Sequence, residues 1–269
     1  MSEVEIKKLE TINQFKKCLG IQKIAWDFED LDIVPIPLLI LAQKYGGLVL
    51  GAFFEEKIVG FVYSFPAVHR GKLIQHSHML AVLPEYRGKG IGRKLKLAQR
   101  EWSLNQGYDL ITWTFDPLQA LNANLNLHTL GVKTKTYLPD FYGPSSSLLH
   151  KGLPTDRILA EWWIKENRVK EKIEKKIKLP DFSSYKKALF GKIKSSHFLE
   201  VDEINLDLKD KTILVEIPQN INLIKEKNID LAFSWQETIR KIFIKYFDEG
   251  YSAIDFISND RCFYLLEKE

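Results

Sequence analysis

The chain has 269 residues, of which 45% are hydrophobic and 28% are charged, and its formal net charge is +4 at pH 7. This length allows one large domain or two small ones with a real core, and the composition is that of an ordinary globular protein. So mild a positive balance does not indicate a nucleic-acid-binding protein. The two cysteines, Cys18 and Cys262, form neither a metal-ligand nor a disulfide spacing, so a reducing compartment fits best and no metal is expected.

Residues 1–10 are polar and charged and lack the apolar core of a signal peptide. The longest apolar run, residues 33–42, contains two prolines and is too short to cross a bilayer. We therefore expect a cytoplasmic protein that does not enter a membrane.

The first part of the chain predicts alternating strands and helices. Residues 4–9 alternate like a strand, Thr11 can cap a helix that runs to Trp26, and Pro37 suits the first turn of a short helix. Three strands are then expected, at residues 48–54, 58–65 and 73–83. The polar residues 55–57 connect the first two as a hairpin, and Pro84 ends the third because proline cannot donate to a ladder.

After a glycine-rich turn, apolar residues recur at helical spacing until Gly107. A strand at 108–115, a helix at 118–130, and strands at 133–141 and 158–164 complete this part. Residues 165–178 are a dense run of Lys, Arg and Glu, which is typical of a solvated helix or linker.

The last third gives a weaker pattern: a strand at 211–217 ended by Pro218, an apolar helical stripe from Trp235 to Phe247, and strands at 252–257 and 262–266. The order strand, proline, helix, glycine–tyrosine, strand also occurs around Pro84 and Gly107. One hypothesis is a degenerate internal repeat without its phosphate loop. Two unrelated α/β segments are the alternative.

The glycine-rich turn lies between a strand and a helix and reads Arg87-Gly88-Lys89-Gly90-Ile91-Gly92. The first amides of a helix have no internal partner, the helix dipole adds positive charge there, and glycines let a phosphate approach the backbone. The turn is therefore a candidate anion site. No Ser or Thr follows to hold magnesium, and the third glycine comes one residue early for a dinucleotide fold, which disfavours a nucleotide-binding oxidoreductase.

The stretch matches the pattern Arg/Gln-x-x-Gly-x-Gly/Ala, and it follows a Leu-Ala-Val strand end and precedes a helix, Gly107-Tyr108 and a strand. With these features the chain resembles the GNAT superfamily of acyl-CoA N-acyltransferases over residues 1–165. The resemblance implies a mixed α/β fold with a mostly antiparallel central sheet flanked by helices. We expect an acyl-CoA-binding domain at 1–165, a charged linker or helix at 166–179, and a smaller α/β domain at 180–269.

The resemblance also implies a cosubstrate, acetyl-CoA or another acyl-CoA, held chiefly by main-chain groups. Amides of the turn would bind its diphosphate, and backbone groups of the preceding strand would pair with pantetheine and the thioester oxygen. Two amides on the next helix are further candidates. The expected cosubstrate-binding residues are Leu80, Val82, Arg87, Gly88, Lys89, Gly90, Ile91, Gly92, Arg93, Asn122 and Asn126.

His76 and His78 are two apart on the strand before the turn, so we expect both on one face, together with Leu80 and Val82. Histidine suits a general base near neutral pH. The segment resembles the His-x-His-x-Leu-Ala-Val strand of serotonin N-acetyltransferase, which implies a role in proton removal. The tyrosine that the family often uses as general acid falls on Leu127 here, so Tyr142 enters as a candidate acid.

Two functions remain open at this point. The first is transfer of an acyl group to a small-molecule or peptide amine by direct attack. The second is a non-catalytic acyl-CoA-binding or regulatory module, which the missing tyrosine favours. The C-terminal part could cover the acceptor cleft, make a homodimer, or stabilise the core.

Overall fold

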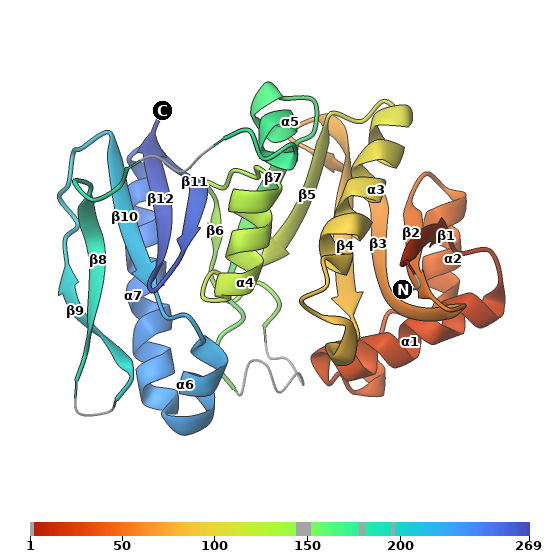
Figure 1. The fold of residues 1–269 in the computed structure, drawn as a ribbon, viewed down its shortest axis with the longest axis horizontal. Helices are drawn as coiled ribbons and strands as arrows, with labels where there is room; N and C mark the ends of the chain where they lie inside the picture. Colours follow the sequence, from red (N-terminus) through yellow and green to blue (C-terminus); the bar gives the residue numbers. More distant parts are fainter. Residues whose placement is uncertain (1–2, 144–151, 178–180, 195–196) are drawn as a thin grey trace. The chain divides into compact units, whose positions relative to one another are not determined.

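A computed structural model describes residues 3–143, 152–177, 181–194 and 197–269 (Figure 1). The chain divides into two compact units. The first comprises the described residues up to Trp113 together with Trp163–Lys165, and the second comprises the other described residues. The division passes through strands β5 (Leu110–Phe115) and β7 (Arg157–Trp163).

The first unit is a mostly antiparallel sheet flanked by helices. Its strands are β1 (Glu5–Lys8), β2 (Leu48–Phe54), β3 (Lys57–His69), β4 (Lys72–Val82) and β5, in that spatial order. All neighbours are antiparallel except β4 and β5, which are parallel. The helical segments are α1 (Ile12–Trp26), η1 (Asp30–Asp32), α2 (Ile36–Lys44), η2 (Pro84–Tyr86) and α3 (Ile91–Asn105).

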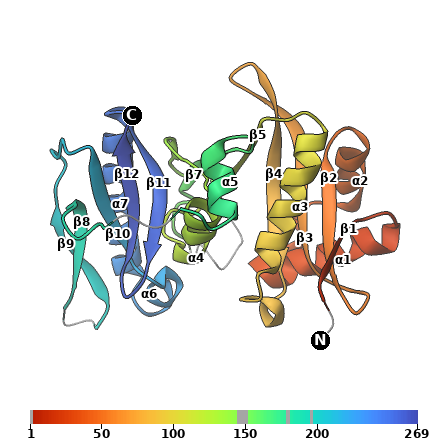
Figure 2. The same cartoon turned by 45° about the horizontal axis from the view of Figure 1, so that its top comes forward.

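These elements confirm the sequence predictions for this unit to within a few residues. Thr11 caps α1 and forms a capping box with Gln14, whose side chain accepts from the Thr11 amide at 3.1 Å. Helix α3 lies along β3 and β4 in both views (Figures 1 and 2). Its buried residues Ile91 and Leu95 join the core formed by α1, α2 and the sheet.

The second unit contains a short strand pair and a separate five-stranded sheet. Strands β6 (Tyr137–Leu138) and β7 are antiparallel. The larger sheet has the order β11-β12-β10-β8-β9. Its strands are β8 (Lys186–Ile193), β9 (Leu199–Ile204), β10 (Thr212–Ile217), β11 (Tyr251–Ser258) and β12 (Cys262–Lys268), and the unit's helices are α4 (Ala120–Ala123), η3 (Asn124–Thr129), α5 (Asn167–Ile173), α6 (Ile221–Lys227) and α7 (Ile229–Asp248).

The C-terminal sheet does not reproduce the strand pairing that a repeat of the first unit requires. In the first unit, β4 and β5 flank α3 and pair directly with each other. In the C-terminal sheet, β12 lies between β10 and β11, and β10 pairs in parallel with β8. The correspondence of β10 and β11 with β4 and β5 therefore fails, because the shared order of elements along the chain does not determine which strands become neighbours, and the internal repeat stays a prediction.

Two further predictions for residues 118–141 need correction. The expected helix is a single turn of α-helix, α4, followed by the π-helix η3. The expected strand at 133–141 contains only the two residues of β6, preceded by isolated bridges at Lys133 and Thr134. Strands β8 and β9 and helix α6 were not predicted, because polar and charged residues interrupt their apolar pattern.

None of the helices within the described ranges combines the length and the apolar character needed to cross a membrane. Within the charged run, Asn167–Ile173 form the helix α5.

A buried carboxylate connects the strand pair of the second unit with its longest helix. Asp156 is 3% exposed and accepts from Arg240 of α7 at 2.8 and 2.7 Å. It also accepts from the hydroxyl of Tyr137 on β6 at 2.6 Å and from the amide of Asp140 at 3.0 Å. Four donors thus compensate the cost of burying this charge.

Asp156→Asn should therefore lower the free energy of unfolding by about 3 kcal/mol, because it leaves the Arg240 guanidinium without its anion. Urea denaturation of the whole chain, followed by tryptophan fluorescence, measures this loss. Asp202→Asn is the matched control: Asp202 pairs with Lys192 and Lys194 at the edge strand β9, where such a pair contributes less than about 1 kcal/mol. Equal losses in the two variants would contradict the importance of the buried network.

Candidate functional site

The two histidines singled out in the sequence lie side by side on β4. The ring of Phe65, on β3, is 5.4 Å from the ring of His76 and 6.0 Å from that of His78, measured between centroids. Contact of one ring with both imidazoles confirms that they share a face. The ring of Tyr63 meets His78 edge-on at 5.8 Å and completes an aromatic group on this face.

A β-bulge in β4 occurs at this point. Tyr63 pairs with Met79 and Ser64 pairs with Ser77, so β4 has one residue more than β3 across this step, and that residue is His78. A bulge interrupts strict alternation and re-aims a side chain. We expected Leu80 and Val82 to share the face of the histidines, which requires strict alternation along β4. The bulge interrupts that alternation, so the expectation does not hold past His78.

His76 is held as a neutral imidazole. Its Nδ1 lies 3.0 Å from the hydroxyl oxygen of Thr112 on β5. Burial lowers the pKa of His76 to about 4, with smaller contributions from the charges of His78, Lys96 and His69. Burial also lowers the pKa of His78, although part of its ring reaches solvent. Both rings are therefore unprotonated at neutral pH and able to accept a proton.

A buried lysine lies close behind the histidines. Lys96 of α3 is 1% exposed, and its Nζ donates to the hydroxyl of Ser77 at 3.1 Å and to Oε1 of Gln99 at 2.8 Å. The same Nζ is 3.5 Å from the ring centroid of Trp113. Burial lowers the pKa of Lys96 well below its ordinary value. Ser77 lies between the two histidines along β4, and the charge of Lys96 contributes to the lowered pKa of His76.

The end of β4 presents an open backbone edge. Its pairing with β5 covers only Gln75 and His76, whereas the strand continues to Val82. The amide of Leu83 donates to Val59 of β3 at 2.9 Å. Because bonding alternates along an antiparallel strand, the N–H and C=O groups of Val82 and Leu80 point away from β3. The carbonyl of Val82 accepts from Nε of Arg87 at 3.0 Å, which is consistent with that direction.

The glycine-rich turn has the conformation expected of an anion cradle. Gly88 and Gly90 have φ angles of 74° and 75°, and a Cβ atom built on either would meet nothing within 4 Å. Gly90 caps α3 without a side-chain bond, and the first intrahelical bond recorded runs from the Lys94 amide to the Gly90 carbonyl at 3.0 Å. The preceding amides therefore face open space at the positive end of the helix dipole.

The side chains of the turn make different contacts. Ile91 is 1% exposed and belongs to the core. The Lys89 ammonium donates to the Glu85 carbonyl at 3.1 Å, and the Lys94 ammonium pairs with Glu3 at 3.2 Å. The turn thus offers an anion its main-chain amides, with Arg93 following them on the first turn of α3.

Four residues discussed in the sequence analysis lie in the second unit. Asn122 is exposed and Asn126 is 5% exposed, so they do not present one common surface. The reason is the π-helix, in which the Leu130 amide bonds to Leu125 and the four-residue spacing is lost. Leu127 is fully buried. The hydroxyl of Tyr142 lies 3.0 Å from that of Thr114, and the Tyr142 side chain is half exposed.

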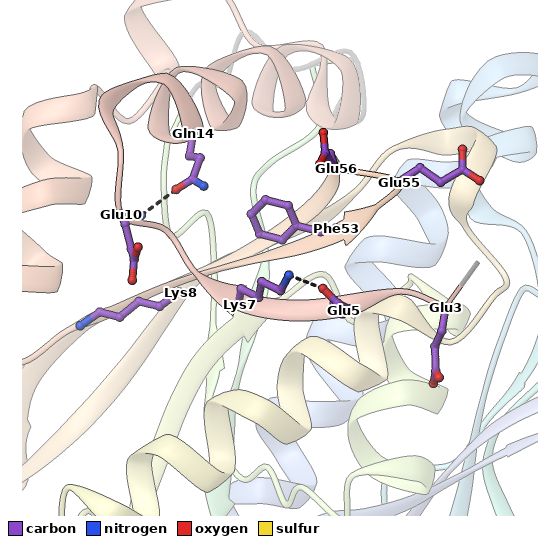
Figure 3. A pocket seen from close by; sticks show the side chains of 9 residues that line it. All are labelled: Glu3, Glu5, Lys7, Lys8, Glu10, Gln14, Phe53, Glu55 and Glu56. Carbon is purple, nitrogen blue, oxygen red and sulfur yellow. Dashed lines mark hydrogen bonds and ion pairs between the residues drawn. The ribbon is translucent and has the colours of Figure 1, made fainter.

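The first unit also has a surface hollow, which is not lined by β4 or the glycine-rich turn. It is formed by β1, the start of α1 and the turn between β2 and β3, and it includes five glutamates and two lysines (Figure 3). The Lys7 ammonium pairs with Glu5, and the Glu10 amide donates to Gln14 at 2.7 Å. None of the predicted site residues contributes to this hollow.

Sequence reasoning missed Tyr63, Phe65, Thr112 and Lys96. The alternation of Tyr63 and Phe65 along one strand was a readable signal for a shared aromatic face. The contacts of Thr112 and Lys96 depend on strand register and helix orientation, which the local sequence does not specify.

Comparisons with known proteins identify the class. Residues 46–127 match the family model of the acetyltransferase (GNAT) domain. Among solved structures, yncA from Salmonella typhimurium with its cofactor acetyl-CoA is similar, with a TM-score of 0.51 and 17% identity, covering 67% of this chain and 99% of that one. The ribosomal-protein-S18-alanine N-acetyltransferase from Escherichia coli gives a TM-score of 0.49 and 18% identity, covering 61% of this chain and 96% of that one. A search of curated proteins found no match.

Residues 46–127 therefore carry a GNAT acetyltransferase domain, and the family resemblance seen in the sequence is confirmed for them. Acyl transfer is the general reaction of this class.

The depressed pKa of His76 predicts an acid-sensitive fold. The folded protein takes up this proton only near pH 4, whereas the unfolded chain takes it up near pH 6.5. Stability should thus fall as the pH drops through this window, by about 2 to 3 kcal/mol from this group alone. His76→Asn, which can keep a bond to Thr112, should remove that part of the pH dependence in urea titrations at pH 7, 6, 5 and 4.

His197→Asn changes an exposed histidine of the second unit and is the control. It should leave the pH dependence as in the parent protein. An unchanged pH dependence in His76→Asn would show that His76 titrates alike in the folded and unfolded states.

Proposed function

We propose that this protein is an N-acyltransferase that moves an acetyl or other acyl group from acyl-CoA to the amine of a small molecule or peptide by direct attack. The observation that carries the proposal is the bulged end of β4. There two neutral imidazoles directly precede, along the strand, a backbone edge that is not paired with β5. That edge leads directly into the glycine turn. A base, an oxyanion donor and a diphosphate cradle thus follow one another along residues 76–93.

The assignment of tasks follows from these positions. Amides from Gly88 through Arg93 bind the diphosphate, and Arg87, Lys89 and Arg93 add positive charge around it. The backbone of Leu80 and Val82 pairs with pantetheine, and a backbone N–H there stabilises the oxyanion of the tetrahedral intermediate. Asn122 and Asn126 are further candidates for contact with acyl-CoA.

The imidazoles of His76 and His78 take the proton of the attacking amine. Because Nδ1 of His76 lies against Thr112, its Nε2 is the nitrogen available for this task. Tyr142, with its hydroxyl beside Thr114, is the candidate general acid carried over from the sequence.

One observation favours a different function, a module that binds acyl-CoA without catalysis. Leu127 is fully buried at the position where the family often has a tyrosine acid. Release of free CoA from acetyl-CoA in the presence of a panel of small amines and peptide N-termini separates the two functions. If calorimetry shows that acetyl-CoA binds, but no amine of the panel causes release of CoA, the binding module is the correct function.

Gly90→Ala should weaken acetyl-CoA binding at least tenfold, since a side chain at φ 75° is strained and its Cβ occupies the cradle. Gly71→Ala provides a matched control, because Gly71 also has φ 75° and open space around it, but it lies in the turn between β3 and β4. Both variants should lose similar stability, and only the first should lose heat of binding in calorimetry. Equal affinities would place the diphosphate elsewhere.

His76→Asn should lower turnover with the best amine of the panel by about a hundredfold or more, with little change in acetyl-CoA affinity, because general bases contribute on this scale. Steady-state kinetics together with calorimetry separate the two quantities. Full turnover at saturating substrates would remove His76 from the reaction.

A further inference from the structure

Tyr63 presents a phenol beside the histidine pair. Its side chain is 6% exposed, and its ring meets His78 edge-on at 5.8 Å and Phe65 at 5.9 Å. Within the described part of the chain the Tyr63 hydroxyl makes no hydrogen bond, and its oxygen is not among the fully buried polar atoms that lack a partner. A phenol buried to this degree usually bonds its hydroxyl to the protein. The ring of this tyrosine lies beside that of His78, edge-on to it.

Three other tyrosines have hydroxyls engaged in hydrogen bonds. That of Tyr137 donates to Asp156 at 2.6 Å, and that of Tyr108 donates to the Gly46 carbonyl at 3.4 Å. Tyr142 shares a hydrogen bond with Thr114 and is half exposed. Tyr63 therefore differs from them in having a proton that no described group accepts.

We propose that the Tyr63 hydroxyl is the proton donor to the departing thiolate, and this inference rests on the proposed acyl transfer. The amine nitrogen forms a bond to the thioester carbonyl carbon, and one imidazole takes the amine proton. The carbon–sulfur bond then breaks, and the sulfur takes the Tyr63 proton. The imidazolium returns a proton to the phenolate, so amine and thioester become amide and thiol with no other reactant.

The phenol holds its proton near neutral pH, since burial raises the pKa of Tyr63 above its ordinary value. The ring of His78 lies edge-on to that of Tyr63 at 5.8 Å between centroids, so the ring that restores the proton is a neighbour of the ring that gives it. The position also explains how the fold tolerates Leu127, since the acid comes from β3 and not from the helix after β5.

The test is Tyr63→Phe, which removes one oxygen and keeps the ring contacts with His78 and Phe65. With acetyl-CoA and the best amine, kcat should fall about a hundredfold, while the KM for acetyl-CoA and the thermal midpoint stay near those of the parent protein. With p-nitrophenyl acetate, whose leaving group needs no proton, the deficit should shrink to less than about threefold.

Tyr45→Phe is the control, because Tyr45 is 67% exposed at the end of α2 and has no task in the reaction. Tyr142→Phe is measured in parallel. Unchanged kcat in Tyr63→Phe, an equal loss with both acyl donors, or a loss confined to Tyr142→Phe would overturn the role of Tyr63 and leave the proposed function standing. A parent protein that releases no CoA with any amine would overturn both.

Discussion

The site depends on a single extra residue in β4. Strand β4 pairs with β3 as far as Val82, but its pairing with β5 ends at His76, so the backbone groups of Leu80 and Val82 that point away from β3 are not paired with β5. The bulge at His78 breaks the register, brings His78 against Tyr63, and coincides with the point where pairing between β4 and β5 stops. Bulges commonly re-aim a side chain and end pairing at functional sites. Here both effects occur next to the same imidazole.

The second constraint is electrostatic. A lysine ammonium and two imidazoles lie close together in a buried region, and like charges at such distances disfavour one another. The protein resolves this conflict by keeping His76 neutral, with Thr112 beside one nitrogen, and by surrounding the Lys96 Nζ with Ser77, Gln99 and the face of Trp113. A cation behind the strand thereby favours the unprotonated imidazole, which is the form that a general base requires.

Much of this arrangement was readable from the sequence, because the signals were local. The strand ending at Pro84, the alternating glycines and the helix from Ile91 follow from propensity and spacing, and the structure confirms them. The bulge was not readable, since a one-residue slip depends on pairing with a strand far away in sequence. For the same reason the proximity of Thr112 to His76 and of Tyr63 to His78 appears only in three dimensions. The π-helix likewise altered which side of residues 122–126 is buried.

The same distinction between local sequence signals and long-range contacts explains which features of the second unit were predicted. Its long helix α7 and the strands β10, β11 and β12 carry strong apolar patterns and were predicted, yet their order in the sheet was not. Buried charges whose partners are distant in sequence join other elements of this unit. Asp255 of β11 accepts from Lys172 of α5 and pairs with His128 of η3, just as Asp156 binds Arg240. Each carboxylate is favourable only when all its donors are in place, so these contacts select one arrangement of elements among those that the apolar pattern allows. Hydrophobic spacing thus defines the elements, whereas a few buried ion pairs contribute to how helices pack against the rest of this unit.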